Sequence, residues 1–490
     1  MTPSLVERLL ETLGSKGVVY CHWKSNADLK EALAKGGELD LLVERKDAQL
    51  FESAVAALGF KRVVDLLHGR FASVFHFYGL DDNTCELVHL HVYYRMTTGE
   101  SLLKNYSFPL EELFLRHSRL VEGVRLPPPA AELMLFVIRA MLKHASPVEY
   151  LLLRRRNRSG YEALRAELEY LLADDAAARC AELLAEWLPA VDRNLFYKCL
   201  EAIRKDAPFV RRFWLALRLR GRLEAYKRSS SASALLQLVL LLLRQALWRW
   251  QGRRSKQPAS GGCVIAFVGP EATGKSTLVK ETAGWLGKTF DVTSAHLGKP
   301  PSTWLTFLPN MALSVARKAV PFLRPRLAES GAPGQTNRRA SLLYSLRAVI
   351  LAWDRRALAL RLRRKAVNGR IVICDRYPSA IVGAMDSARL KTPVERGRWR
   401  GLLGYLAKVE NQLYRQIPPP DAVIQLTVPV EVAVQRNQER RQKDAAAFVV
   451  HRHTAVMVPT FPTAKTVELN SNQPRSQTIN SARQIIWDAL

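Results

Sequence analysis

The spacing of apolar residues changes twice along the chain and divides it into three regions. Residues 1–126 mix short apolar runs, typical of strands, with helical patterns, and Pro127, Pro128 and Pro129 then interrupt the chain. Residues 130–252 repeat apolar positions at three- and four-residue intervals, which predicts helices throughout. Residues 253–262, RRSKQPASGG, are charged and then rich in small residues, Pro and Gly, which is typical of a linker.

The last region, residues 263–490, alternates apolar runs with long helical patterns. The runs predict strands at 264–268, 371–374 and 422–428, a weaker one at 466–469, and a fifth candidate at 291–297. Apolar strands that alternate with helices favour a parallel sheet covered on both faces. We therefore expect an α/β domain at 263–490, preceded by an α+β domain at 1–126 and a helical region at 130–252.

A phosphate-binding motif follows the first of these strands. The run Gly269-Pro270-Glu271-Ala272-Thr273-Gly274-Lys275-Ser276 fits G-x-x-x-x-G-K-[ST], and a helical pattern that starts with Thr277 and Leu278 continues it. Such a loop turns backbone N–H groups toward phosphate oxygens, and the helix start adds a partial positive charge. Lys275 can reach the β- and γ-phosphates, and the Ser276 hydroxyl can ligate Mg²⁺. The chain has no guanine-reading Asn-Lys-x-Asp segment, so we expect ATP with Mg²⁺.

Two further segments carry groups suited to phosphate chemistry. Asp375-Arg376-Tyr377 ends the strand at 371–374, where ligands bind in such folds. The carboxylate could hold the metal or orient the acceptor, and the arginine could clamp phosphate. The second segment, VEVAVQRNQERRQKD, places Arg436, Arg440 and Arg441 on a predicted helix, where arginines could close over a transferring phosphoryl group. The alternative is a solvated basic helix.

Together these segments resemble the thymidylate kinase family of P-loop kinases. The resemblance covers most of 263–490 and rests on GPEATGKST, LAWDRR, VICDRYPSA, PDAVIQLTVPVEVAVQR and the terminal VELNSNQPRSQTINSARQIIWDAL. It implies that Glu271 contacts the acceptor, that Lys275, Ser276 and Thr277 serve ATP phosphates and Mg²⁺, and that Asp375 lies near the metal. It further implies that Arg376 and Arg355 hold the acceptor monophosphate, that Tyr377 belongs to the substrate-binding residues, and that Arg436, Arg440 and Arg441 belong to a lid.

The sequence departs from that family around the acceptor. In place of its Thr-Arg-Glu-Pro-Gly-Gly type of segment the chain reads AHLGKPP at 295–301, and an apolar, basic insertion follows at about 302–340. The implied activity is transfer of the γ-phosphoryl group of ATP to a nucleoside monophosphate resembling dTMP, or to a related phosphorylated acceptor.

The N-terminal region has its own candidate site. A strand, the turn Lys24-Ser25-Asn26, a helix and the strand bearing Glu38 and Asp40 resemble the nucleotidyltransferase fold of the DNA polymerase beta superfamily. Carboxylates two apart on a strand share a face and could hold Mg²⁺. Glu86 is a candidate third acid, although it does not share a face with His89 and His91. The alternatives are an active nucleotidyltransferase with the P-loop domain as an ATP-sensing partner, and a substrate-binding or scaffolding domain.

Charge indicates anionic partners. The 490 residues carry 73 Lys and Arg against 45 Asp and Glu, a net charge of +28, and residues 261–490 hold 34 of the basic and 15 of the acidic side chains. No zinc-finger spacing or RNA-recognition signature is present, so a nucleotide or an anionic membrane surface is expected rather than nucleic acid. A solvated basic surface is the alternative.

One apolar segment raises the question of membrane association. Residues 234–243, ALLQLVLLLL, are almost wholly apolar and have basic residues on both flanks. They predict either a helix buried in the protein or one that lies on a membrane interface. Six cysteines without paired spacing and an N-terminus unlike a signal peptide favour the cytoplasm, with or without peripheral membrane association. A non-catalytic, ATP-binding module of the membrane surface is a third functional hypothesis.

Overall fold

The computed structural model divides into two compact units, Met1–Ser255 and Lys256–Leu490. The division falls inside the predicted linker. The structure describes residues 3–29, 37–67, 73–99, 103–145, 159–172, 176–319, 342–390, 400–439 and 444–490.

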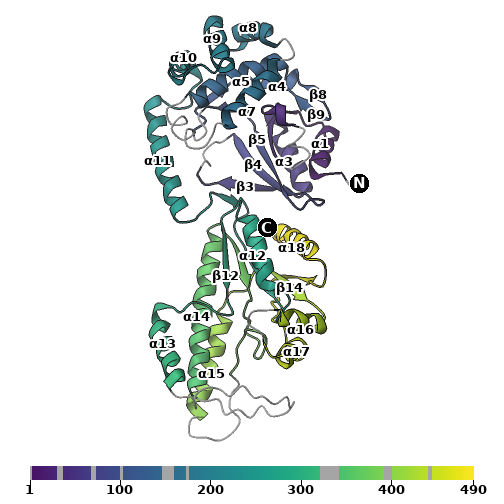
Figure 1. The fold of residues 1–490 in the computed structure, drawn as a ribbon, viewed down its shortest axis with the longest axis vertical. Coiled ribbons are helices and arrows are strands. Elements are labelled where there is room, and N and C mark those ends of the chain that lie inside the picture. The colour runs from purple at the N-terminus through teal and green to yellow at the C-terminus, as the bar shows by residue number, and fades with distance from the viewer. Residues whose placement is uncertain are drawn as a thin grey trace. The chain divides into compact units, whose positions relative to one another are not determined.

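The main sheet of the first unit is mixed, with its strands in the order β1-β2-β5-β4-β3 (Figure 1). Strand β2 runs parallel to β5, and the other neighbours run antiparallel. Two small hairpins, β6-β7 and β8-β9, accompany it. The strands are β1 (Tyr20–His22), β2 (Glu38–Val43), β3 (Lys61–Asp65), β4 (Val74–Leu80), β5 (Leu87–Tyr93), β6 (Met96–Thr98), β7 (Tyr106–Phe108), β8 (Arg119–Val121) and β9 (Val124–Leu126).

The described part of the first unit also contains helices. They are α1 (Leu5–Ser15), α3 (Ala48–Ala57), α4 (Glu111–Arg116), α5 (Pro129–His144), α7 (Ser159–Leu172), α8 (Ala176–Trp187), α9 (Arg193–Arg204), α10 (Phe209–Arg222) and α11 (Ser231–Trp250), with short 3₁₀ turns η1 (Asn26–Asp28), η2 (Arg45–Asp47) and η3 (Glu224–Tyr226). The capping box of Ser4 and Glu7 starts α1.

The predicted α+β and helical regions share one hydrophobic core. Trp23 and Tyr93 from the sheet side are buried in the same cluster as Leu133 of α5 and Phe196 of α9. The residues on either side of the three prolines therefore pack together within one unit, because α5 begins at Pro129 and carries an almost wholly buried apolar sequence.

The second unit contains a five-stranded parallel sheet in the order β12-β13-β11-β14-β15. Its strands are β11 (Val264–Val268), β12 (Val292–His296), β13 (Ile371–Asp375), β14 (Ala422–Thr427) and β15 (Lys465–Asn470), and the short strand β10 (Lys256–Pro258) precedes them. All five predicted strands are present with nearly the predicted bounds. The expected α/β architecture with a parallel sheet is therefore confirmed for this unit.

Helices pack on both faces of the parallel sheet (Figure 1). On one face Ala266 and Val372 share a buried cluster with Ala352 and Leu362 of α14, while α12 and α18 contact each other and the sheet. The helices are α12 (Lys275–Leu286), α13 (Trp304–Ala319), α14 (Leu342–Val367), α15 (Arg400–Arg415), α16 (Val430–Gln438), α17 (Ala446–Thr454) and α18 (Arg475–Ala489). The described part of the predicted insertion forms α13, and residues 320–340 lie outside the described residues.

Gly262, just before β11, tests this packing. A Cβ at this position would lie 2.1 Å from the Arg370 carbonyl oxygen and 2.6 Å from that of Ala366. Because both neighbours are backbone atoms, Gly262→Ala should force a backbone shift and lower the free energy of unfolding of the second unit by about 1–3 kcal/mol. Differential scanning calorimetry of the full chain measures the effect.

Gly284→Ala is the matched control. Gly284 lies inside α12, and a Cβ there would meet nothing within 4 Å. We expect this change to be neutral or to stabilise the unit by about 0.5–1 kcal/mol. Equal destabilisation by both changes would contradict the packing described here.

Candidate functional site

The loop between β11 and α12 makes the sharp turn that a phosphate-binding loop requires. Gly269 has φ 137°, and a Cβ there would lie 2.5 Å from the Leu426 carbonyl oxygen of β14. Ala272 and Gly274 also have positive φ, 63° and 90°, and Gly274 caps α12. This conformation turns the chain from strand to helix, and it directs the N-terminus of α12 toward the carboxyl edge of the sheet, where an anion is favoured.

Lys275, the first residue of α12, is folded back onto its own loop. Its ammonium donates to the Pro270 carbonyl and, at 3.2 Å, to the Thr273 hydroxyl, and only 5% of the residue is exposed. Burial, together with the charge of Arg376, lowers the pKa of Lys275 to about 7. A phosphate group bound in the loop would supply the negative charge that this buried ammonium lacks.

Ser276 and Asp375 form the next part of the site. Parallel pairing of β11 with β13 places Phe267 beside Asp375, so this carboxylate lies next to the phosphate-binding loop. The Ser276 hydroxyl donates to Asp375 Oδ2. Within the described residues, Asp375 Oδ1 is buried without a hydrogen-bond partner. A hydroxyl and a carboxylate with a spare oxygen fit Mg²⁺, which takes oxygen ligands and keeps several waters.

Glu271 connects the loop to a group of cations. Its carboxylate pairs with Arg452 of α17 at 2.9 Å and with Arg376 at 3.4 Å, and its carbonyl oxygen lies 2.8 Å from His453 Nε2. Arg376 also pairs with Asp386 at 2.9 Å. Burial alone would raise the pKa of Glu271, but the hydrogen bond and charge of Arg452 and the charge of Arg376 hold it below its usual value.

A cavity of about 530 Å³ opens beside this network. Its lining contains more cations than anions: Glu271, His296, Gly298, Lys299, Arg376, Gly383, Ala384, Asp386, Arg389, Phe448, Arg452 and Val456. Four Lys and Arg side chains face two carboxylates, which suits an acceptor with an anionic group. The segment at 295–301, where the sequence departs from the thymidylate kinase pattern, supplies three of these residues.

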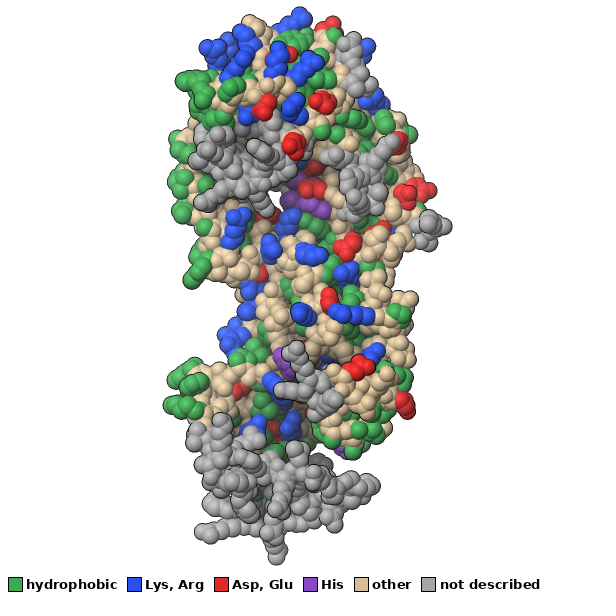
Figure 2. Space-filling model, viewed as in Figure 1, with side chains coloured by type: hydrophobic (Ala, Val, Ile, Leu, Met, Phe, Trp, Pro, Cys, Tyr) green, Lys and Arg blue, Asp and Glu red, His purple; other side chains and the backbone are tan. Residues whose placement is uncertain are grey.

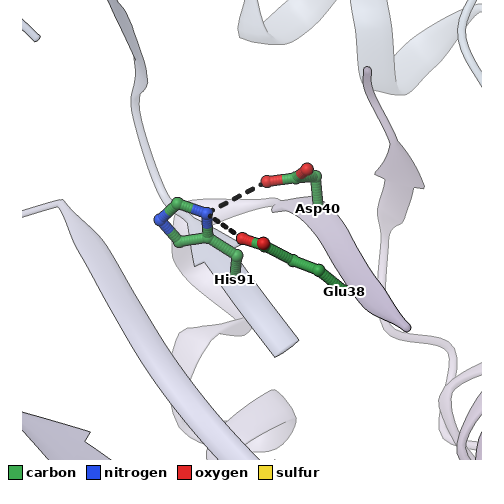
Figure 3. A group of neighbouring side chains, drawn as sticks. All are labelled: Glu38, Asp40 and His91. Carbon is green, nitrogen blue, oxygen red and sulfur yellow. Dashed lines mark ion pairs between the residues drawn. The ribbon is translucent and has the colours of Figure 1, made fainter. Parts of the chain in front are cut away.

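A second group of chemically active side chains lies in the first unit (Figure 3). His91 of β5 is the register partner of Asp40 on β2, and its Nδ1 lies 2.9 Å from Glu38 Oε1 and 3.1 Å from Asp40 Oδ1. Among the described residues, these three form the group whose spacing could hold a metal ion. Glu86 is exposed just before β5 and is not a member.

Two lysines lie against this group. Lys24 Nζ is 2.7 Å from Asp40 Oδ1, and Lys104 Nζ is 3.1 Å from His91 Nε2 and 2.9 Å from the Tyr93 hydroxyl. Burial would raise the pKa of Asp40, but Lys24 and His91 hold it well below its usual value. Burial, with the charge of Lys24, lowers the pKa of Lys104 to about 7.

Comparison with known proteins gives matches of fold only. No protein-family model and no curated protein matches the sequence. Solved structures match 46% of the chain. They include a sugar kinase from Janibacter sp. HTCC2649 (17% identity, 94% of that chain, TM-score 0.25), thymidylate kinase from Ehrlichia chaffeensis (14%, 98%, 0.24) and a gluconokinase from Sinorhizobium meliloti 1021 (13%, 94%, 0.23).

The structure brings some of the predicted site residues together. Glu271 and Arg376 form an ion pair, and Lys275, Ser276 and Asp375 lie at the same edge of the sheet. Tyr377, in contrast, is buried, and its hydroxyl donates to the Pro418 carbonyl at 2.7 Å. Arg436 of α16 donates to the Ser471 carbonyl. Arg440 and Arg441 lie outside the described residues, so their place in a lid stays a prediction.

Arg355 has an unexpected environment. The side chain is 1% exposed, and its N–H groups donate to the carbonyl oxygens of Leu297, Gly298 and Asp386, to the Asp386 carboxylate and to the Tyr414 hydroxyl. Five such bonds match the five donors of a guanidinium. In this arrangement Arg355 holds the backbone at 297–298 beside the cavity, and its predicted contact with the acceptor stays a prediction.

Sequence reasoning missed Arg452, His453 and Asp386. The helix Ala446–Thr454 carries the first two, and its FVVHRHT sequence resembles no phosphate-binding motif. Asp386 lies in the loop after β13, where a carboxylate near Asp375-Arg376 offered a weak signal. These residues become visible as site residues only when the fold brings α17 and this loop to Glu271.

The Glu271 network generates a stability prediction. Glu271→Gln preserves volume but leaves Arg452 and Arg376 without their shared carboxylate, so we expect a loss of about 1–3 kcal/mol of unfolding free energy at pH 7. Because the pKa of Glu271 is lowered in the fold, its contribution is present above the usual value of 4.5 and is lost as pH falls through the folded-state pKa. The difference between wild type and variant should therefore shrink below about pH 4.5.

Denaturant unfolding at several pH values measures this difference. Glu281→Gln is the control, because Glu281 is 41% exposed in its pair with exposed Arg475, and such surface pairs contribute about 0–1 kcal/mol. A Glu271→Gln effect that is no larger than the Glu281→Gln effect, or that does not depend on pH, would contradict the assignment.

Proposed function

We propose that the second unit is an ATP-dependent phosphotransferase whose acceptor is a nucleoside monophosphate resembling dTMP or a related phosphorylated molecule. The observation that carries the proposal is the Asp375 carboxylate. One of its oxygens accepts from Ser276 of the phosphate-binding loop, while the other is buried and unpartnered within the described residues. That arrangement suits a metal-bound triphosphate at the carboxyl edge of the sheet.

Each part of the site has a role in this reaction. The loop N–H groups and Lys275 would bind the phosphates of ATP, and Ser276 and Asp375 would hold Mg²⁺. The bound metal would neutralise charge on the β- and γ-phosphate oxygens. The acceptor oxygen attacks the γ-phosphorus, the bond to the bridging oxygen of ADP breaks, and the acceptor proton is lost to solvent or to a nearby base. Catalysis is then mainly positioning and charge neutralisation.

The acceptor would occupy the 530 Å³ cavity. Arg376 stands between Glu271 and Asp386, so its guanidinium is held at the boundary between the loop and the cavity. Lys299, Arg389 and Arg452 add positive charge for an anionic acceptor group. Glu271 and Asp386 could accept hydrogen bonds from acceptor hydroxyls.

The Lys275→Ala variant tests the phosphotransferase proposal. We expect phosphoryl transfer from ATP, with Mg²⁺, to at least one acceptor in a panel of dTMP, other nucleoside monophosphates and sugar phosphates. Loss of the buried ammonium should lower that rate by about 10²-fold or more. Transfer of labelled γ-phosphate to the acceptor is the measurement.

Lys280→Ala is the matched control on the same helix. Lys280 is exposed on α12, so its removal changes net charge equally without touching the loop, and we expect a rate close to wild type. If no acceptor in the panel is phosphorylated in a Lys275-dependent manner, the proposal is wrong.

The Glu38–Asp40–His91 group favours a second candidate, nucleotidyl transfer in the first unit. Its two carboxylates and imidazole would hold a divalent cation. Lys24 and Lys104 would then face the phosphates of a nucleoside triphosphate. In that reaction an acceptor hydroxyl attacks the α-phosphorus, and the bond to pyrophosphate breaks.

Asp40→Asn separates this candidate from the kinase. Incorporation of α-labelled nucleotide with release of pyrophosphate should fall by about 10²-fold or more in Asp40→Asn and should persist in Lys275→Ala. Glu86→Gln, a change at an exposed carboxylate outside the group, should leave it unchanged. Incorporation that is absent from wild type, or that Lys275→Ala abolishes, would refute the candidate and leave the first unit a binding or scaffolding role.

A further inference from the structure

Helix α11 is unusually apolar for a helix on a protein surface. Its 20 residues include no Asp or Glu, and it is long and apolar enough to cross a membrane by length and composition. Yet only 11% of the apolar 18-residue stretch of this helix is buried in the protein. The prediction of a helix buried in the protein core therefore does not describe this segment.

Five of the exposed apolar side chains of α11 form a stripe. Leu236, Leu240, Leu243, Leu247 and Trp250 follow one another at three- and four-residue intervals, and their exposed fractions range from 49% to 84%. Such spacing places them on one face of a helix. Figure 2 shows apolar side chains gathered along the edge of the first unit where Figure 1 labels α11.

The opposite face holds α11 against its own unit. Ala234 and Leu238 are buried with Leu103. Before the helix, the Asn105 side chain bonds to the Ser229 backbone at 3.1 Å. At the other end, just after the helix, the Leu66 N–H donates to the Ser255 carbonyl oxygen at 2.9 Å. A helix held along one side and at both ends suits the plane of an interface better than a span across a bilayer.

The charges around the stripe indicate which kind of partner it fits. Arg244 and Arg249 lie within α11, and Arg253 and Arg254 follow it, with no acid on the helix. A symmetric contact between two copies would offer these arginines no carboxylate from the partner helix, because the same surface meets itself in such an interface. An anionic lipid surface instead offers apolar chains for the leucines and phosphate groups for the arginines, with Trp250 at the headgroup level.

We propose that α11 docks the first unit on an anionic lipid surface, with the Leu236–Trp250 stripe inserted between headgroups and acyl chains. This surface is distinct from both candidate reaction sites and does not depend on the proposed enzyme activity. It would hold the protein at a membrane as a peripheral protein.

Vesicle co-sedimentation of the full chain tests this proposal. We expect binding to vesicles of phosphatidylcholine with phosphatidylglycerol, and weak binding to phosphatidylcholine alone. Rising salt should weaken the binding, because exposed charges are screened within about 10 Å at 0.1 M. Leu240→Ser with Leu243→Ser should lower the partition coefficient about tenfold or more, since each leucine side chain then loses its burial in the lipid.

Leu120→Ser is the matched control, because Leu120 is 67% exposed on β8 of the same unit. We expect this variant to bind like wild type, and circular dichroism checks that the variants fold alike. Absence of binding to the anionic vesicles, or equal binding by the Leu240→Ser/Leu243→Ser variant, would overturn the proposal. So would a dimer of the free protein, seen by analytical ultracentrifugation, that these two changes dissociate.

Discussion

The parallel register of β11 and β13 is the constraint on which the second unit's site depends. It pairs Phe267 with Asp375, so the loop after one strand and the carboxylate that ends the other reach the same edge of the sheet. The Gly269 turn is equally confined, because the Leu426 carbonyl of β14 leaves no room for a Cβ. The neighbouring strands thus shape the phosphate-binding loop from both sides, and the position of Ser276 beside Asp375 follows from sheet pairing rather than from loop sequence alone.

A network of ion pairs joins the phosphate-binding loop to the wall of the cavity. Glu271 belongs to the loop, yet its carboxylate holds Arg452 of α17 and Arg376 of the loop after β13. Arg376 is in turn held by Asp386, whose backbone carbonyl accepts from the buried Arg355. Movement of any one of these groups would leave a partly buried charge without its partner, which is costly. The network therefore links the phosphate-binding loop to the 297–298 backbone and to α17, two parts of the cavity wall.

The sequence predicts the parts of this arrangement that are local. The strand at 264–268, the loop motif and Asp375 at a strand end each have a signature within a few residues, and the structure places them as expected. The environment of Arg355 has no such signature, because its partners come from residues 297–298, 386 and 414. Likewise the alternation of residues excludes Glu86 from the face of His91, but only the β2–β5 register reveals His91 beside Asp40.

The two candidate sites differ in how their charges are already balanced. In the first unit, Lys24 lies against the Asp40 carboxylate and Lys104 against the His91 imidazole, two of the groups that a cation would need. A divalent ion there has to displace an ammonium, so its binding free energy is less favourable than it would be beside free carboxylates. A phosphate ligand that attracts the lysines at the same time would remove this cost. In the second unit, and within the described residues, the buried Lys275 has only the Pro270 carbonyl and the Thr273 hydroxyl as hydrogen-bond acceptors, and Asp375 retains an unpartnered oxygen. That unit is therefore better prepared for a metal-bound phosphate, which is why the phosphotransferase is the primary proposal and nucleotidyl transfer the second.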